Sequence, residues 1–152
     1  AAAAGTAHAQ TTRSAIMVDG QQYDVTFRNG VTFDAYETEI SSNGSRDLSN
    51  NQIAAPWWNA SPTAAQNFAQ ALYNANNADS NIRFAHKSAT IFGTEAIYAA
   101  TYDGSTLLTD VYAQNASSNY AISAVAVPAP LPILGILPVV GFLKRMRKRQ
   151  RA

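Results

Sequence analysis

The chain of 152 residues contains no cysteine. Disulfide cross-links, thiolate zinc sites and cysteine nucleophiles are therefore excluded. Histidine is scarce: only His8 and His86 occur, and neither lies in a His-x-x-x-His pattern or beside a calcium-binding loop pattern. The sequence also lacks the Gly-x-Ser-x-Gly pattern of a nucleophile elbow and a glycine-rich phosphate loop. We therefore predict no enzyme activity, no catalytic residues, no metal site and no cofactor.

Positive charge is nearly absent from most of the chain. Of the 11 lysines and arginines, six lie in residues 144–151, whereas the 10 acidic residues all precede residue 144. The first 143 residues are therefore acidic overall. Phosphate recognition needs a basic patch on the folded surface, so this charge balance argues against nucleic acid as a partner.

Charge of either sign is missing from Val111 to Leu143, and between Ala121 and Leu143 the only polar side chain is Ser123. A helix of about 20 apolar residues crosses the core of a bilayer. Basic residues follow at once, as is typical of the cytoplasmic end of a spanning segment. We predict a transmembrane helix at 131–143 and a basic cytoplasmic tail at 144–152, whose stop signal consists of Lys144, Arg145, Arg147, Lys148, Arg149 and Arg151.

A short proline motif precedes the apolar run and consists of Val127, Pro128, Ala129 and Pro130. The order of proline motif, apolar span and terminal basic cluster resembles the PEP-CTERM sorting signal, in its Pro-Ala-Pro variant. The resemblance implies processing by an exosortase, a membrane protease or transpeptidase that cuts near the motif and passes the rest of the protein to the cell surface. It covers only the tail and concerns delivery, not biochemical activity.

Two other interpretations of the tail stay open. Counted from Leu131 alone, the apolar run has the length of a buried core helix or an interfacial segment, and Pro138 would kink a helix. Membrane helices nevertheless tolerate proline and glycine. The alternatives to a processed sorting signal are an uncleaved tail anchor and a C-terminal element of a soluble domain.

The first residues are almost all small, and Ala7 and Ala9 flank His8 in the small-x-small pattern of a signal-peptidase site. We expect residues 1–9 to be the end of a truncated signal peptide, with Gln10 as the new N-terminus. The alternative is a disordered alanine-rich arm.

Between these ends we expect one domain at residues 10–120, a short flexible linker at Gln114–Ala121 that overlaps its end, and a linker with the sorting motif at 121–130. Residues 14–36 alternate in hydrophobicity and contain Asp-Gly and Asn-Gly, both strong hairpin signals, so they predict a three-strand meander ending at 31–33. Residues 41–55 have the composition of a loop.

A helix is expected to start at Pro62, because Ser61 is a natural N-cap and proline suits the first helical position. Its apolar stripe would contain Ala64, Phe68, Leu72 and Ala75. Strands are expected again at 82–84, 90–92, 96–99 and 107–112, with a hairpin turn at 103–104. The order of strands, one helix and strands predicts an α+β fold: a small antiparallel sheet with one main helix packed on it, separate from the C-terminal helix.

Three sets of residues invite functional hypotheses. His86 has no partner residues in the sequence, and we expect it at the solvent or at a strand end. Glu37 and Glu39 would share one face of a strand; a carboxylate pair can serve glycoside hydrolysis, but a solvated strand face is the commoner arrangement. Trp57 and Trp58 could stack on sugar rings, or one could cap the core while the other lies half exposed.

We therefore expect an exported protein, anchored in the inner membrane by its C-terminus and then released to the cell surface or the extracellular matrix, with a structural or adhesive role. The expected partners are the membrane, an exosortase and an exopolysaccharide. A glycan-binding module that uses Trp57 and Trp58 is the alternative, and a small hydrolase is the least supported.

Overall fold

The structure is a computed structural model and describes residues 9–45, 47–48, 52–75 and 81–129. Its elements follow in the order β1 (Gln10–Val18), β2 (Gln21–Val31), α1 (Phe33–Ser45), β3 (Asp47–Leu48), β4 (Gln52–Ile53), α2 (Pro62–Ala75), β5 (Ile82–Ile91), β6 (Thr94–Tyr102), β7 (Leu107–Ala113) and β8 (Ser118–Ala126).

Six of these strands form one sheet, in the order β1-β2-β8-β5-β6-β7, and β3 and β4 form a separate pair. The neighbours in the large sheet are antiparallel, except β5 and β8, which run parallel where Arg83 pairs with Tyr120. The α+β class is confirmed. The sheet is mixed instead of purely antiparallel, because β8 lies between β2 and β5 and runs parallel to β5.

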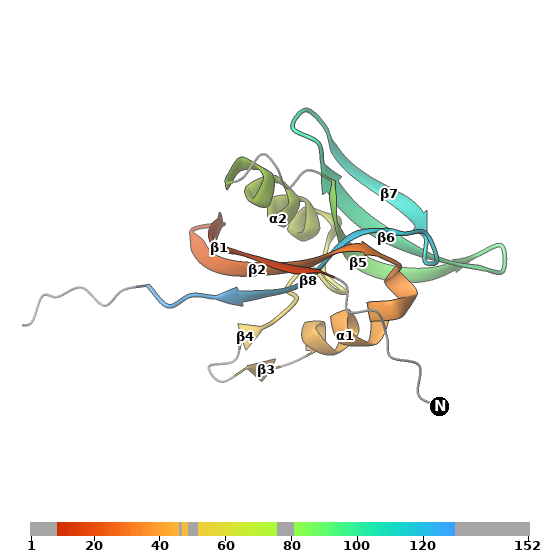
Figure 1. Cartoon of the computed structure of the whole chain (residues 1–152), viewed down its shortest axis with the longest axis horizontal. Coiled ribbons are helices and arrows are strands. Elements are labelled where there is room, and N and C mark those ends of the chain that lie inside the picture. The colour runs from red at the N-terminus through yellow and green to blue at the C-terminus, as the bar shows by residue number, and fades with distance from the viewer. Residues whose placement is uncertain (1–8, 46, 49–51, 76–80, 130–152) are drawn as a thin grey trace, which may run out of the picture.

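Two helices pack on this sheet, not one, and they lie on opposite sides of it (Figure 1). The predicted start of α2 is confirmed, since the backbone N–H of Ala64 contacts both the carbonyl and the hydroxyl oxygen of Ser61, at 3.1 and 3.4 Å. The predicted stripe is partly wrong: Ala75 is exposed. The buried side chains follow i, i+3, i+4 and i+7, the spacing of one continuous helix face, and are Ala65, Phe68, Ala69 and Leu72.

The third strand of the predicted meander is wrong. Asn29 and Gly30 do not turn the chain; they lie inside β2, where Gly30 has a φ of +65° and the pairing register with β8 shifts. Helix α1 begins at Phe33, and the carbonyl oxygen of Gln114 accepts hydrogen bonds from the backbone N–H groups of Phe33 and Asp34, at 2.9 and 3.4 Å. The first N–H groups of α1, which have no partner within the helix, are thus bonded by a residue about 80 positions away in sequence. Local composition could not reveal this contact.

The predicted C-terminal boundary of the domain is also wrong. Residues 118–126 form β8, an inner strand, instead of the end of one linker and the beginning of the next. Tyr120, Ala121 and Ala124 are fully buried there. A strand that is buried on both faces shows no alternation of polar and apolar residues, so the small, uncharged residues of β8 gave no strand signal.

Aromatic side chains fill both interfaces between helix and sheet. On the α2 side, the ring of Trp57 lies 5.1 Å from that of Phe68 and 4.9 Å from that of Phe84. On the α1 side, Phe33 lies 5.8 Å from both Trp58 and Tyr120. The segment that connects the helices therefore contributes one tryptophan to each interface.

Candidate functional site

The part of the predicted sorting motif that the structure describes begins where β8 ends. Ala126 is the last residue of β8 and pairs with Tyr23 of β2. One residue further on, the backbone N–H of Val127 donates a 2.8 Å hydrogen bond to the carbonyl oxygen of Gln22. The side-chain Nε2 of Gln21 donates to the carbonyl oxygen of Val127, at 2.9 Å. Both backbone polar groups of Val127 are thus bonded to the beginning of β2.

Pro128 ends this pairing. Proline has no backbone N–H and cannot donate to a strand ladder, and Pro128 and Ala129 are exposed whereas Val127 is half-buried. In Figure 1 this end of β8 leads away from the body of the domain. The proline motif therefore follows the central sheet with no intervening spacer, in contrast to the linker expected from the sequence.

The other predicted sorting and processing residues are only partly covered by the structure. Ala9 is exposed, and its carbonyl oxygen accepts a 3.3 Å hydrogen bond from the N–H of Asn29. Ala7, Pro130, the apolar segment 131–143 and the basic residues of 144–151 lie outside the described residues. None of the helices within the described ranges has the length and hydrophobicity to cross a bilayer.

The proposed sugar-stacking role of Trp57 and Trp58 is contradicted by their burial. Their exposed fractions are 0% and 8%, and both rings pack against other aromatic rings. Trp58 also packs closely against α1, because Gly44 has no side chain: a Cβ there would lie 2.5 Å from Cδ1 of Trp58. Stacking on a sugar needs a free ring face, which neither tryptophan offers.

His86 is buried, with 5% of its surface exposed, so the expected solvent-facing position is wrong. It lies in β5 at an irregularity in the pairing with β6, and its carbonyl oxygen accepts a 2.8 Å hydrogen bond from the N–H of Asn59. Burial lowers the pKa of His86, and the neighbouring Lys87 lowers it further. Within the described residues its Nε2 atom has no hydrogen-bond partner. His86 is therefore a packed internal side chain, and its burial favours the neutral form of the imidazole.

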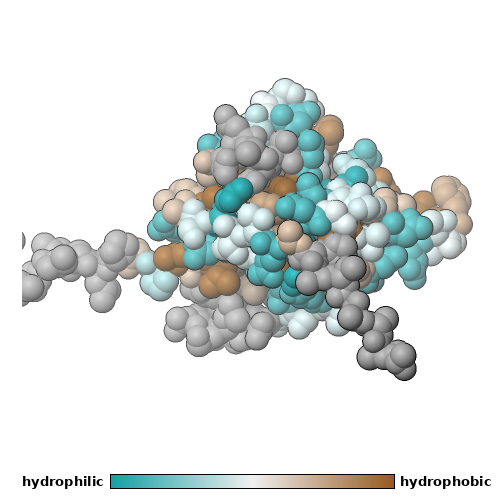
Figure 2. All heavy atoms as spheres, viewed as in Figure 1, coloured by the Kyte–Doolittle hydropathy of each residue, from teal (hydrophilic) through white to brown (hydrophobic). Residues whose placement is uncertain are grey.

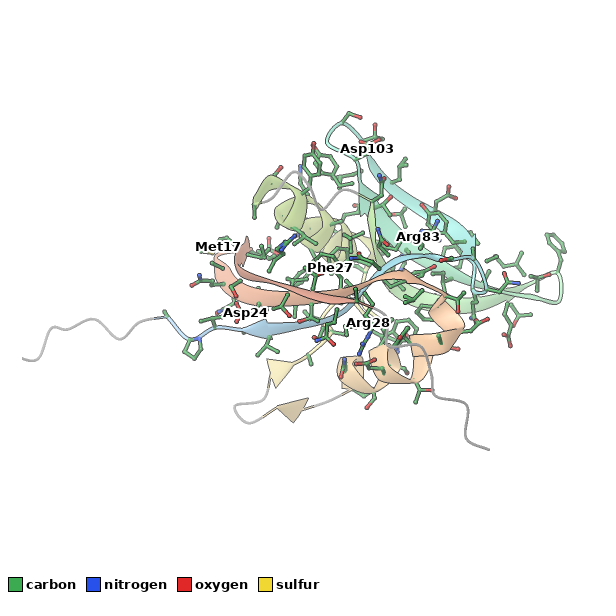
Figure 3. The ribbon with its side chains drawn as sticks, viewed as in Figure 1. Met17, Asp24, Phe27, Arg28, Arg83 and Asp103 are labelled. Carbon is green, nitrogen blue, oxygen red and sulfur yellow. The ribbon has the colours of Figure 1, made fainter. Side chains whose placement is uncertain are left out.

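Glu37 and Glu39 lie on α1 and not on a strand, so residues two apart no longer share a face. Glu39 accepts hydrogen bonds from Arg28 at 3.2 Å, and Figure 3 shows Arg28 extending toward α1. Burial raises the pKa of Glu37, and the carboxylates of Glu95 and Asp34 raise it further. The paired-carboxylate arrangement considered for glycoside hydrolysis is therefore absent at these two residues.

A shallow open cavity of about 440 Å³ lies between β1 and α2, and among the described residues that line it only Asp19 has an ionisable side chain. Nδ2 of Asn67 lies 3.1 Å from one carboxylate oxygen of Asp19. The described residues contain no group of three or more His, Asp or Glu side chains that could hold a metal ion. The remaining lining residues are Ala15, Met17, Val18, Gln70, Ala71, Asn74 and Ala75.

Sequence reasoning missed two arrangements. Gln21, which holds Val127, is an ordinary polar strand residue with no distinctive pattern around it. Arg83 stacks its guanidinium 3.6 Å from the ring centre of Tyr112 and donates a 3.1 Å hydrogen bond to the hydroxyl oxygen of Tyr120. Both arrangements depend on long-range strand pairing.

Comparisons of the chain with protein-family models, curated proteins and solved structures find no match.

Proposed function

We propose that this chain is an exported protein with a structural or adhesive role at the cell surface or in the extracellular matrix, delivered through a C-terminal sorting signal. The observation that carries the proposal is the order of residues in the tail: a proline motif at 127–130, an apolar run at 131–143 and a basic cluster at 144–151. This order suits an apolar segment in lipid with cations on the cytoplasmic side. An exosortase is the proposed processing enzyme.

The end of β8 supports the proposal in one respect. A protease that cuts beside a folded domain needs an extended, accessible backbone, and Pro128 and Ala129 are both exposed. The residue before a proline also favours an extended conformation, and Val127 continues the direction of β8. Hydrogen bonds to Gln21 and Gln22 hold it in this direction.

The native protein should be followed in the cells that make it, by fractionation and intact mass. We expect an early membrane-bound form and a later form that lacks the basic cluster and is found at the surface or in the matrix. A chain that keeps its basic cluster and occurs in the cytosolic fraction would contradict the proposal.

Two variants separate the contributions of the tail. Replacing Pro128 and Pro130 together by alanine should leave the protein in the membrane without shortening it, because the apolar run and the cations are intact. Replacing all six basic residues of 144–151 by glutamine should weaken retention in the membrane. If both variants are processed like the native chain, the tail does not act as a sorting signal.

Binding of an exopolysaccharide is a second candidate function, now assigned to the cavity between β1 and α2 and not to the buried tryptophans. A carboxylate and several amides line this cavity, and such groups hydrogen-bond sugar hydroxyls. Co-sedimentation with the purified matrix polysaccharide tests it. Asn67→Ala and Asn74→Ala should lower retention, whereas the distant substitution Gln10→Ala should not. Equal retention of all the variants would contradict a glycan site here.

A further inference from the structure

The two edges of the large sheet differ in how well they are protected against pairing with another chain. Edge strand β1 has a register break between Arg13 and Ile16, and Ala15 has a φ of +64°. Such bulges are a common device against edge-to-edge association. Edge strand β7 pairs with β6 in one unbroken register from Leu107 to Ala113. It contains no proline, glycine, lysine or arginine, and Asp110 is its one charged residue, so its outer edge has little of the usual protection.

Strand β7 also exposes apolar side chains on both faces. Six of its seven residues are exposed, and only Tyr112 is half-buried. Leu107, Leu108 and Val111 expose 37%, 45% and 40% of their surfaces. In Figure 2 much of the visible surface is hydrophilic, with separate brown patches of apolar residues. Within the described residues the outer backbone groups of β7 bond to no other strand, and the N–H of Val111 donates only to the side chain of its neighbour Asp110, a bond that an added strand would replace. An edge strand of this kind, with apolar side chains on both faces, fits the addition of a further strand.

Two opposite charges lie beside one face of β7, Asp110 of β7 and Arg83 of β5, and they are not paired within the described residues. Asp110 and Tyr112 lie two apart and so share a face, and the guanidinium of Arg83 lies 3.6 Å from the ring centre of Tyr112. Figure 3 shows Arg83 beside β6 and β7. Within the described residues no carboxylate lies within ion-pair distance of Arg83, and Asp110 accepts a hydrogen bond only from the adjacent N–H of Val111, at 2.8 Å.

We propose that β7 pairs with β7 of a second copy of this chain, antiparallel and with the two-fold axis at Val111. This register places Asp110 of each copy opposite Tyr112 of the other, near the Arg83 guanidinium, so that two charge pairs form reciprocally. A register centred on Asp110 would instead set the two carboxylates against each other. The proposed dimer joins the two sheets into one, and it does not depend on the C-terminal tail.

The cross-link test uses the absence of native cysteine. At a two-fold axis a residue faces its own copy, and opposed residues of antiparallel strands lie about 4.5–5.5 Å apart between Cα atoms, within disulfide range. The full chain with Val111→Cys, in detergent micelles, should therefore form a disulfide-linked dimer on mild oxidation. Thr109→Cys faces Ala113 of the other copy in this register, and Val125→Cys lies in β8; both should stay monomeric on denaturing gels.

Sedimentation of the same full-length chain measures the affinity. Val111→Lys places two ammonium groups face to face and should raise the dimer Kd at least about tenfold, whereas the control Val125→Lys should not change it. The two valines are exposed to 40% and 42%, so they form a matched pair. Asp110→Asn should raise the Kd about fivefold, since two exposed charge pairs are lost.

The outcomes are distinct. Dimers linked through Thr109→Cys would replace the proposed register by another one, and a Kd equally insensitive to Val111→Lys and Val125→Lys would place any self-association elsewhere. Monomers at every concentration tested would also overturn the proposal. Thermal melts of each variant at low concentration check that a loss of dimer is not a loss of fold. A failure of sorting in cells leaves these measurements unaffected, so the two proposals can fail separately.

Discussion

Strands β7 and β8 follow each other in sequence but differ sharply in their environment. β7 contains two leucines and a valine and lies at the edge of the sheet, largely exposed. β8 contains three alanines and only two larger aliphatic residues besides Tyr120, and lies between β2 and β5 with all but one of its residues buried or half-buried. The more hydrophobic strand is therefore the more exposed one.

The difference shows that strand order, more than side-chain hydrophobicity, decides burial in this sheet. β8 has a paired strand on each side and packs against α1, and its small side chains leave room for this close contact. An edge strand such as β7 has a neighbouring strand on one side only. Its leucines then remain at the surface, where they are available to a partner.

Two tyrosines give the most sensitive test of this contrast, because both contact the same arginine. Tyr120 of β8 is fully buried and Tyr112 of β7 is half-buried, and Arg83 lies against both. We expect Tyr120→Ala to lower the free energy of unfolding by about 3–5 kcal/mol, the range for large aromatic residues in a core. Tyr112→Ala should cost about 1 kcal/mol. Urea denaturation measures both, and equal losses would contradict the assigned burial.

Adding volume tests the same contrast from the opposite direction. Ala121 of β8 is fully buried, whereas Ala113 of β7 is exposed. Ala121→Leu should destabilise the domain by about 1–3 kcal/mol, because a packed core has no space for the added methylenes. Ala113→Leu should change stability by less than about 0.5 kcal/mol. Thermal melts at low concentration compare them. A neutral Ala121→Leu variant would mean that β8 is not packed as described.

The contrast also explains what could be predicted of the fold. The alternating strands β1 and β2, the turn at Asp19, the capped start of α2 and the strand at β7 all carry local signals, and each was predicted. Helix α1 and strand β8 were missed, since their positions depend on contacts with distant segments. The carbonyl of Gln114 bonds the start of α1, and β8 pairs with β2 and with β5.

For the candidate sites, the sequence indicated which residues to consider but not whether each one is buried or exposed. Trp57 and Trp58 are distinctive in sequence, but only packing shows that both are internal. The sorting motif was predicted from residue order alone and stays a prediction. Its close attachment to the sheet through Gln21 could not be foreseen, because the bond spans 106 positions in sequence.

His86 of β5 is buried, and its burial predicts that the stability of the domain depends on pH. An exposed histidine would not give this effect. Burial is the main cause that lowers the folded-state pKa of His86. The unfolded chain then binds a proton at higher pH than the folded one, so stability falls as the pH drops below about 6.5 and levels off below the folded-state pKa.

Urea titrations between neutral and mildly acidic pH measure this slope, which for one proton is at most about 1.4 kcal/mol per pH unit. His86→Gln replaces the imidazole by a side chain of similar size that does not bind a proton in this pH range. The free energy of unfolding should therefore depend less steeply on pH in this variant. Subtracting the two pH profiles removes contributions from other groups, including Glu37, whose raised pKa acts in the opposite direction. An unchanged slope in His86→Gln would show that His86 is not responsible.

The smallest expected effect concerns the end of β8, where the buried strand becomes the exposed motif. Gln21→Ala removes the side-chain hydrogen bond to the carbonyl of Val127 but leaves the backbone bond between Val127 and Gln22. The free energy of unfolding should fall by only about 0.5–1.5 kcal/mol, whereas amide exchange at Val127 should accelerate locally. Gln10→Ala, at the beginning of β1, is the control. Val127 exchange that is equally fast in the native chain and in Gln21→Ala would show that Gln21 does not hold the motif against the sheet.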